Sequence, residues 1–164
     1  MKKMGMVVFA ACLFSMGCLK ESNSTVTTPT CTPEAESVEL PYIDQYIGKD
    51  SVTFKEDSTS GVFYHITAPG SGLAASIYSD IFFTYNATLL DGTSIGSSSA
   101  TVEQPISNIV TGIQAMAGYL KNGTKIQLII PSALAYGCQP FTADSITVPA
   151  NSVVVFNLNI SSIQ

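Results

Sequence analysis

The sequence contains no arginine, a single histidine and four cysteines that form no closely spaced pair. Without arginine, the chain lacks the side chain that holds phosphate or carboxylate through two parallel hydrogen bonds. Seven lysines against twelve acidic residues give a formal net charge of −5, which disfavours binding to nucleic acid. His65 cannot form a zinc site alone, and no CxxC spacing supplies cysteine ligands. The composition therefore argues against chemistry that needs a metal, a nucleotide or a serine–histidine pair.

Long hydrophobic runs are also missing. The apolar stretch from Gly5 to Gly17 follows a positively charged start and is shorter than the roughly 20 residues that span a bilayer. This pattern is typical of a secretory signal. The ending Phe14-Ser-Met-Gly-Cys18 resembles the cleavage box of bacterial lipoproteins, which predicts a signal peptide over residues 1–17 and lipidation of Cys18. The alternatives are an ordinary signal peptide and cleavage at Cys12.

Residues 18–33 have almost no apolar content. Such a segment buries too little surface to offset chain entropy, so we expect a flexible tether. The anchored protein would lie in the cell envelope, on the outer membrane, facing the periplasm or the cell surface. Its acidic, Ser/Thr-rich composition predicts that it is solvated rather than drawn onto an anionic bilayer.

A helical N-terminal extension is predicted for residues 34–60. Thr32 is a candidate N-cap, with Pro33 at the first helical position. Apolar residues then recur at steps of three and four, namely Val38, Tyr42, Ile43, Tyr46 and Ile47. Pro41 interrupts this stripe, so the pattern fits either a helix that begins near Leu40 or two short pieces. We expect the stripe to pack on the main domain; a face for a partner or a second copy is the alternative.

Residues 61–164 carry the pattern of a sheet domain. Alternating or apolar runs predict strands at 61–67, 80–86, on both sides of Asp91-Gly92, at 125–130 and at 153–160. His65 is predicted on the surface of the first of these strands. One helix is predicted over 106–120, while the segment after Ile95 and residues 138–149 are predicted to be loops. The order predicts an α+β domain in which a curved antiparallel β-sheet wraps around one short helix.

Two motifs in the last third are specific: Ile130-Pro-Ser-Ala-Leu-Ala-Tyr-Gly137 and Val148-Pro-Ala-Asn-Ser-Val-Val-Val-Phe156. Shorter pieces precede them in matching order, namely Tyr85 ahead of Asp91-Gly92, Ile106-Ser-Asn-Ile-Val-Thr-Gly112 and Gly123-Thr-Lys125. With these pieces, residues 61–160 resemble FKBP-type peptidyl-prolyl cis-trans isomerases over essentially the whole domain. The resemblance implies the FKBP-like fold and an apolar pocket between sheet and helix, which binds the prolyl side chain of an extended peptide.

The resemblance also implies which residues form this pocket. The catalytic set would be Tyr136, whose hydroxyl meets a substrate carbonyl, with Tyr85 and Phe156 as apolar walls. The implied substrate-binding residues are Ile95, Ile109, Val110, Ile113 and Val148. Without the resemblance, the same side chains read equally well as the core of a curved sheet.

Two departures weaken the implied pocket. Ile113 holds the position of the family's usual tryptophan floor, and Ile95-Gly96 replaces a Phe-Asp pair, so the pocket carboxylate is absent. Prolyl isomerisation itself needs no nucleophile, metal or cofactor, because the enzyme only has to favour the twisted amide in a dry site. We therefore expect no cofactor, and an isomerase whose activity is reduced.

Three functions stay open on the sequence. The first is a lipid-anchored prolyl isomerase and folding chaperone, acting on proline-containing peptides or unfolded envelope and secreted proteins. The second is a catalytically degenerate FKBP-like lipoprotein that binds peptides or a partner protein. The third is a structural lipoprotein without a ligand. Cys31 and Cys138 remain after lipidation, and in an oxidising compartment they either form a disulfide that pins the tether to the long loop or stay free.

Overall fold

The structure, a computed structural model, describes residues 31–49, 51–143 and 146–164. The predicted signal peptide, the lipidation site Cys18 and most of the predicted tether lie outside the described residues. Among the described residues, no helix is both long and apolar enough to cross a bilayer.

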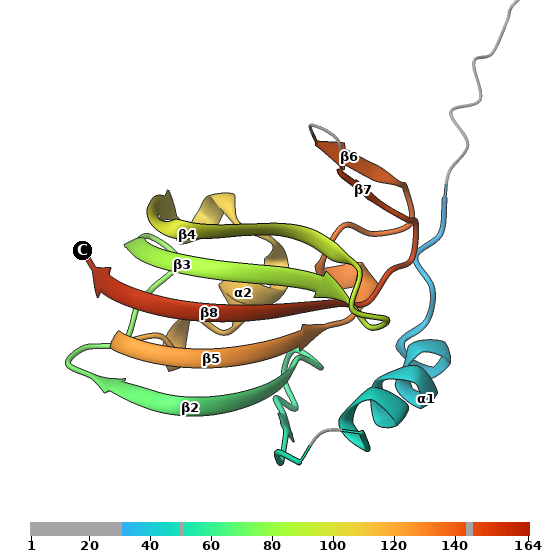
Figure 1. The fold of residues 1–164 in the computed structure, drawn as a ribbon, viewed down its shortest axis with the longest axis horizontal. Coiled ribbons are helices and arrows are strands. Elements are labelled where there is room, and N and C mark those ends of the chain that lie inside the picture. The colour runs from blue at the N-terminus through green and yellow to red at the C-terminus, as the bar shows by residue number, and fades with distance from the viewer. Residues whose placement is uncertain (1–30, 50, 144–145) are drawn as a thin grey trace, which may run out of the picture. The chain divides into compact units, whose positions relative to one another are not determined.

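The described residues form a six-stranded sheet in the order β1-β2-β5-β8-β3-β4 and a separate two-stranded hairpin (Figure 1). The sheet strands are β1 Lys55–Glu56, β2 Phe63–Ser71, β3 Asp80–Leu89, β4 Ser94–Pro105, β5 Asn122–Ile130 and β8 Val154–Ile163. The hairpin strands are β6 Phe141–Ala143 and β7 Ile146–Val148. Every pair of neighbouring strands is antiparallel. The predicted α+β fold class is therefore confirmed.

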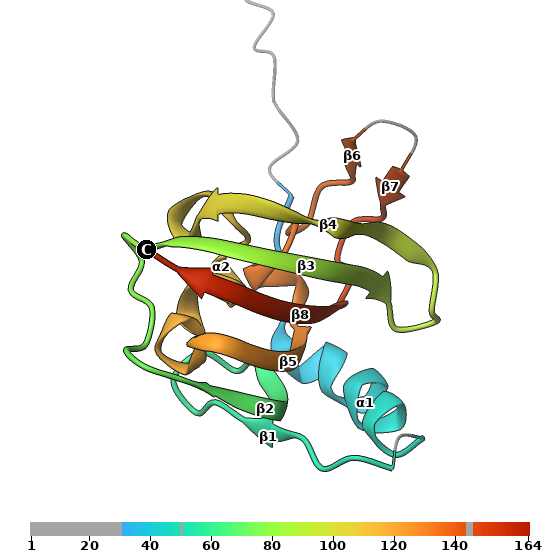
Figure 2. The ribbon, with the colours of Figure 1, turned by 60° about the vertical axis from the view of Figure 1, so that its left-hand side comes forward.

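The sheet curves around a short helical segment, which lies on its concave side in both views (Figures 1 and 2). This segment consists of η1 Ile106–Asn108, α2 Thr111–Ala115 and η2 Ala117–Tyr119. The prediction of one helix over residues 106–120 is therefore wrong. The apolar residues keep their spacing across the breaks between these three pieces, so Ile113, Met116 and Leu120 are all buried against the sheet. The buried apolar side chains, not one continuous helix, hold this segment in place.

Strand β5 shows why its sequence ends in a fully apolar run. Leu128 and Ile130 pack into the main cluster on the α2 side, whereas Ile129 belongs to a second cluster. Successive side chains of a strand point to opposite faces, so this division places apolar cover on both faces of the sheet. The second cluster also contains Ile43 of α1 (Glu36–Ile47) and Val155 of β8.

Helix α1 packs on the domain through Ile43, but Val38 and Tyr42 of the predicted stripe are exposed, and the ends and course of the helix also differ from the prediction. It begins at Glu36 after Ala35, which makes no side-chain cap, so Thr32 is not the N-cap. Pro41 lies inside one continuous helix, on the exposed side. The missing proline N–H removes one backbone hydrogen bond. Burial of Ile43, which has no exposed surface, offsets this loss.

Two predicted loops contain strands. The segment after Ile95 belongs to β4, which pairs with β3 from Ser94 to Pro105 and is rich in serine and threonine. Residues 138–149 contain the hairpin β6–β7, which pairs Phe141 with Val148. Both elements are held by backbone ladders at the edge of the structure and carry little apolar alternation. Hydrophobic periodicity therefore does not reveal them.

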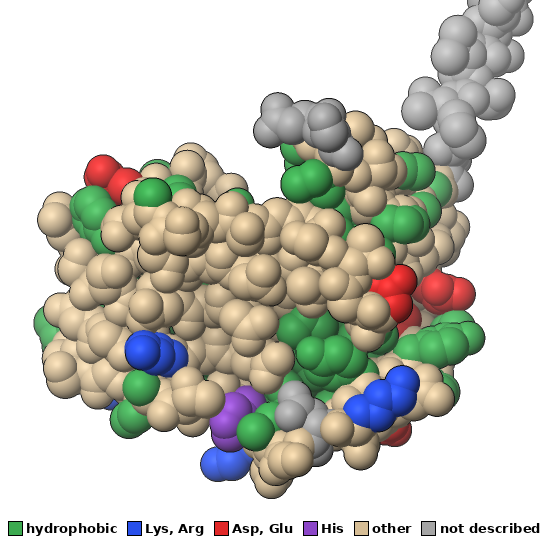
Figure 3. Space-filling model, viewed as in Figure 1, with side chains coloured by type: hydrophobic (Ala, Val, Ile, Leu, Met, Phe, Trp, Pro, Cys, Tyr) green, Lys and Arg blue, Asp and Glu red, His purple; other side chains and the backbone are tan. Residues whose placement is uncertain are grey.

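The outer face of the sheet is covered mainly by uncharged polar side chains, as the space-filling view shows (Figure 3). A shallow hollow of about 400 Å³ on this face is lined by Thr84, Asn86, Gln127, Asn157 and Asn159, among others. The residues of the main apolar cluster on the same strands point to the concave side, where the candidate site lies.

Candidate functional site

Three aromatic rings from distant parts of the sequence gather around the concave side of the sheet. Tyr85 lies on β3 and Phe156 on β8, and their ring centroids are 6.4 Å apart. These strands are neighbours in the sheet, with Tyr85 opposite Leu158 and Ala87 opposite Phe156. Residues two apart on a strand share a face, so both rings point to the same side as the buried Leu158.

Tyr136 reaches the same place from the loop after β5. It follows η3 Ser132–Leu134 and is half-buried. Burial raises the pKa of its hydroxyl, and the nearby Tyr85 hydroxyl raises that pKa further. Tyr85 and Tyr136 both pack against the same apolar cluster. A tyrosine hydroxyl is protonated at neutral pH, so Tyr136 can donate a hydrogen bond there.

All eight predicted site residues belong to one apolar cluster, either as buried members or packed against it: Tyr85, Ile95, Ile109, Val110, Ile113, Tyr136, Val148 and Phe156. They differ in exposure. Ile113 and Val148 are each only 1% exposed, whereas Tyr85 and Tyr136 are half-buried. A ligand entering from solvent would first meet the half-buried members, with Ile113 beneath them. The roles of these residues in binding or catalysis stay predictions.

Gly96 lies beside the Tyr85 ring. A Cβ added at Gly96 would be 3.7 Å from the Tyr85 hydroxyl oxygen, an ordinary contact distance. The backbone φ of 150° at Gly96 is one that other residues rarely adopt. A side chain at this position would therefore fit next to the Tyr85 hydroxyl. The backbone conformation, however, is one that favours glycine.

Gly112 has a different role, which the sequence does not reveal. A Cβ added there would lie only 2.3 Å from the Ile130 Cγ2 atom. Glycine is thus required for α2 to approach β5 this closely. This approach positions Val110 and Ile113, which flank Gly112 within two residues.

Sequence reasoning missed two further residues near Tyr136. Phe141 of β6 stacks on the Tyr136 ring, with centroids 4.7 Å apart and an interplanar angle of 22°. Glu39 of α1 accepts a hydrogen bond from the Ser132 backbone N–H, at 3.0 Å. Phe141 lies in a segment without a recognisable motif, and Glu39 is 93 residues from its partner. No local pattern signals either contact.

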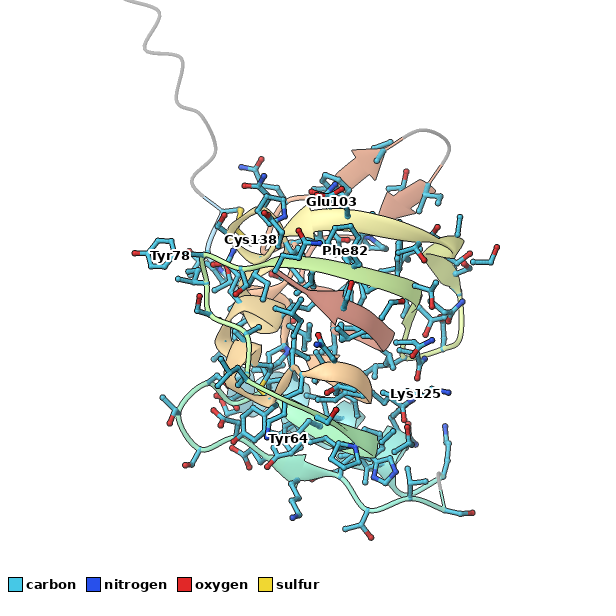
Figure 4. All side chains as sticks on the ribbon, turned by 90° about the vertical axis from the view of Figure 1, so that its left-hand side faces the viewer. Tyr64, Tyr78, Phe82, Glu103, Lys125 and Cys138 are labelled. Atoms are coloured by element: carbon cyan, nitrogen blue, oxygen red, sulfur yellow. A yellow bond between two sulfur atoms is a disulfide. The ribbon has the colours of Figure 1, made fainter. Side chains whose placement is uncertain are left out.

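The pairing that the sequence left open is formed. Cys31 and Cys138 are joined by a disulfide, with Cα atoms 5.6 Å apart (Figure 4). Cys138 is two residues beyond Tyr136, so the bond ties the start of the described chain to the loop that carries this tyrosine.

His65 contacts Thr53 and Phe54 rather than the predicted site residues. His65 Nδ1 lies 3.0 Å from the Thr53 carbonyl oxygen, and its ring is 5.9 Å from that of Phe54. Within the described residues, no group of three or more His, Cys, Asp or Glu side chains could hold a metal ion.

A curved antiparallel sheet closed on a short helix, with tyrosine and phenylalanine rings on its concave side, defines an α+β domain of the FKBP type. The comparisons agree, because the family model for FKBP-type peptidyl-prolyl cis-trans isomerase matches residues 74–161. The chain therefore belongs to the FKBP-type peptidyl-prolyl cis-trans isomerase family.

Curated relatives include FKBP-type peptidyl-prolyl cis-trans isomerases named FkpA. The Escherichia coli K12 protein is 30% identical over 111 residues, which are 65% of this chain and 39% of that protein. A Buchnera aphidicola protein is 29% identical over 106 residues, which are 63% of this chain and 42% of its own length. The chain thus matches only about two fifths of the length of these relatives.

Solved structures show the same fold. The crystal structure of FkpA from Escherichia coli superimposes with a TM-score of 0.67 at 25% identity, covering 79% of this chain and 61% of that one. A peptidyl-prolyl cis-trans isomerase from Pseudomonas syringae gives a TM-score of 0.64 at 20% identity and covers 81% of this chain and 98% of that one. At this lower identity, the second match shows the fold alone.

Proposed function

We propose that this chain is a peptidyl-prolyl cis-trans isomerase that acts on proline-containing segments of proteins outside the cytoplasm. The observation that carries the proposal is the convergence of Tyr85, Tyr136 and Phe156 on the concave face of a domain of this family. A prolyl ring would pack against Tyr85 and Phe156, beside Ile109 and Val110 at the rim.

The chemistry follows from the nature of the amide barrier. Rotation about the X–Pro bond is slow because resonance must be broken, at roughly 18–20 kcal/mol. A site shielded from water favours the less polar twisted amide over the planar one. The protonated Tyr136 hydroxyl would donate a hydrogen bond to a substrate carbonyl and hold the peptide in the twisted pose.

The activity is proposed to be reduced relative to a site with an aromatic floor. Ile113 offers less contact area to a prolyl ring than a tryptophan would. Gly96 supplies no carboxylate beside Tyr85. Neither position holds a group that takes part in making bonds, so neither departure removes a reaction step. Both departures instead weaken the binding of the prolyl ring and reduce the polarity of the site.

The location is proposed to be the cell envelope, with a lipid anchor on Cys18. The disulfide between Cys31 and Cys138 supports an oxidising compartment. Intact-mass measurement on protein extracted from membranes tests the anchor. A mass that includes the lipidated Cys18 is expected, and an unmodified mature chain would exclude the anchor while leaving the isomerase proposal intact.

A catalytically degenerate peptide-binding protein is the second candidate. It is favoured by the near-complete burial of Phe156, at 6% exposed, and of Ile113, which leaves little open apolar surface for a prolyl ring. In this case the domain would hold extended peptides through the half-buried Tyr85 and Tyr136 without turnover.

An isomerisation assay on a panel of Ala-Xaa-Pro-Phe peptides distinguishes the two candidates. We expect catalysis above the uncatalysed rate for at least one residue Xaa, and a loss of rate in Tyr136→Phe. Peptide binding by calorimetry with no rate above background for any Xaa would favour the degenerate binder. If the protein neither binds these peptides nor catalyses their isomerisation, both candidates are wrong.

A further inference from the structure

We propose that the N-terminal segment from Cys31 to Glu39 is a clamp that positions Tyr136, and that Glu39 is its central positioning residue. This inference rests on the proposed function, because it assigns Tyr136 to the isomerase site. The segment lies outside residues 74–161, the part of the chain that matches the family model.

The environment of Glu39 is unusual for a surface helix. It is only 3% exposed, whereas the neighbouring Glu36 and Val38 are exposed. Its Oε2 atom accepts the Ser132 N–H at 3.0 Å, and its Oε1 atom is buried without a hydrogen-bond partner among the described residues. Burial of a carboxyl group is unfavourable unless specific hydrogen bonds offset it. A glutamate that only stabilised the helix would stay in solvent.

The partner of Glu39 is Ser132, the first residue of η3, whose carbonyl oxygen holds the backbone around Tyr136. The Ser132 carbonyl oxygen accepts two hydrogen bonds, from Ala135 N–H at 3.0 Å and from Gly137 N–H at 2.8 Å. Ala135 and Gly137 are the residues on either side of Tyr136. Glu39 therefore fixes the Ser132 N–H, and the Ser132 carbonyl oxygen holds the backbone N–H groups of the two residues next to Tyr136.

The same segment holds the other side of the loop. The Gly137 carbonyl oxygen accepts the Asn151 N–H at 2.9 Å, and Asn151 Oδ1 accepts the Glu34 N–H at 3.3 Å. The disulfide then joins Cys31 to Cys138, the residue after Gly137. Contacts from 31, 34 and 39 thus reach the loop both before and after Tyr136.

These contacts restrict the movement of a half-buried side chain. Catalysis by positioning is sensitive to displacements on the order of 1 Å. Since Tyr136 itself sits on an irregular loop after η3, support from outside the loop limits how far its side chain can shift. The clamp supplies that support from a separate element.

Kinetics of the full chain test the role of Glu39. Glu39→Ala leaves the buried Ser132 N–H without an acceptor, and we expect kcat/KM to fall about tenfold, mostly through kcat. Glu39→Gln keeps an oxygen acceptor and should restore most of the rate. Asp44→Ala removes a carboxylate from the exposed side of the same helix and should leave the rate unchanged. Equal losses in Glu39→Ala and Asp44→Ala would overturn the proposal.

Amide hydrogen exchange gives a readout that does not depend on activity. In Glu39→Ala, and separately in Cys138→Ser, we expect exchange at Ser132, Ala135 and Gly137 to speed up about tenfold or more. The β3–β8 ladder should be unaffected in both variants. Unchanged exchange in the loop would overturn the clamp even if the wild type is active. If the two variants exchange faster but the wild type proves inactive as an isomerase, the clamp is supported and only the isomerase proposal is defeated.

Discussion

At the scale of single residues, the candidate site depends on two phenols, Tyr85 and Tyr136, which pack against the same apolar cluster. The pKa of Tyr136 is raised by burial first and by Tyr85 second, above an ordinary value at which the hydroxyl is already protonated at neutral pH. The ring of Tyr136 is held separately by its stacking on Phe141. Hydroxyl and ring therefore make distinct contributions that substitutions can separate.

Tyr136→Phe removes the hydroxyl and keeps the stacked ring. We expect kcat/KM to fall about threefold to tenfold while the free energy of unfolding changes by less than about 1 kcal/mol, because one hydrogen-bond donor is lost and the packing remains. Isomerisation kinetics and urea unfolding measure the two effects. Tyr42→Phe, on the exposed side of α1, is the matched control. An unchanged rate in Tyr136→Phe would remove Tyr136 from the mechanism.

Gly96→Asp tests whether the absent carboxylate limits activity. The new side chain would lie beside the Tyr85 hydroxyl, since the added Cβ falls 3.7 Å from it. The strained backbone should lower stability by about 1–3 kcal/mol, and Gly96→Ala should show the same loss without a carboxylate. We expect Gly96→Asp to have about threefold higher kcat/KM than Gly96→Ala. Equal rates for the two variants would show that the carboxylate is irrelevant here.

Asp57 links acid stability to a specific turn. Its carboxylate accepts hydrogen bonds from Ser60 and from the Tyr119 hydroxyl, the latter at 3.1 Å. The pKa of Asp57 lies below its ordinary 3.8, mainly because of the hydrogen bonds from Ser60. The hydrogen bond from Tyr119 lowers this pKa further. A lowered folded-state pKa gives stability that is present above pH 3.8 and lost as the pH falls through the folded pKa.

Asp57→Asn should therefore melt at a lower temperature than the wild type at pH 7. The difference should disappear as the pH is lowered past the folded pKa of Asp57, where the wild type loses the same charge. Thermal melts between pH 7 and pH 2.5 measure this convergence, with Asp44→Asn as an exposed control. A difference that stays constant over the whole range would refute the assignment.

At the scale of elements, the close approach of α2 to β5 holds the concave face together. Gly112→Ala would place a methyl group 2.3 Å from Ile130 and force α2 outward. We expect a loss of about 1–3 kcal/mol in the free energy of unfolding, as for other overpacked sites. Gly118→Ala is the matched control, because nothing lies within 4 Å of its added Cβ. Similar stability of the two variants would contradict the close packing.

Elements with strong apolar patterning were predictable, and those without it were not. β5 and β8 alternate clearly, and both lie where the pattern placed them. The continuation of β4 beyond Ile95 was missed because its pairing with β3 depends on backbone hydrogen bonds between polar residues. The helix over 106–120 was overextended because apolar spacing cannot show where Met116 leaves helical geometry, with φ −90° and ψ 6°.

The candidate site divides in the same way. Residues in continuous motifs, such as Tyr136 and Phe156, were found from the sequence and do lie in one cluster. Glu39 and Phe141 were not found, because each acts through a contact that is specified only by the folded structure. Pro41 misled the interpretation of α1, since tertiary packing of Ile43 overrides the local break.

At the scale of the whole molecule, the disulfide connects residues separated by 107 positions. The double variant Cys31→Ser/Cys138→Ser should lose about 2–5 kcal/mol of stability, because the unfolded chain regains a large loop entropy. Unfolding in urea, with and without reductant, measures the loss. Reductant should destabilise the wild type to the level of the double variant and leave the double variant unchanged. A wild type insensitive to full reduction would contradict a stabilising role.

The disulfide also decides how the domain bears mechanical load. A pull applied between the two ends of the chain passes from Cys31 directly to Cys138, so residues 32–137 lie inside a covalently closed ring and carry no tension. Among the described residues, those from 139 to 164, which carry β6, β7 and β8, lie outside this ring and can be drawn out. At about 3.5 Å per extended residue this segment lengthens to roughly 90 Å. A tethered molecule under tension would therefore lose β8, and Phe156 with it, while α1 and α2 stay inside the ring.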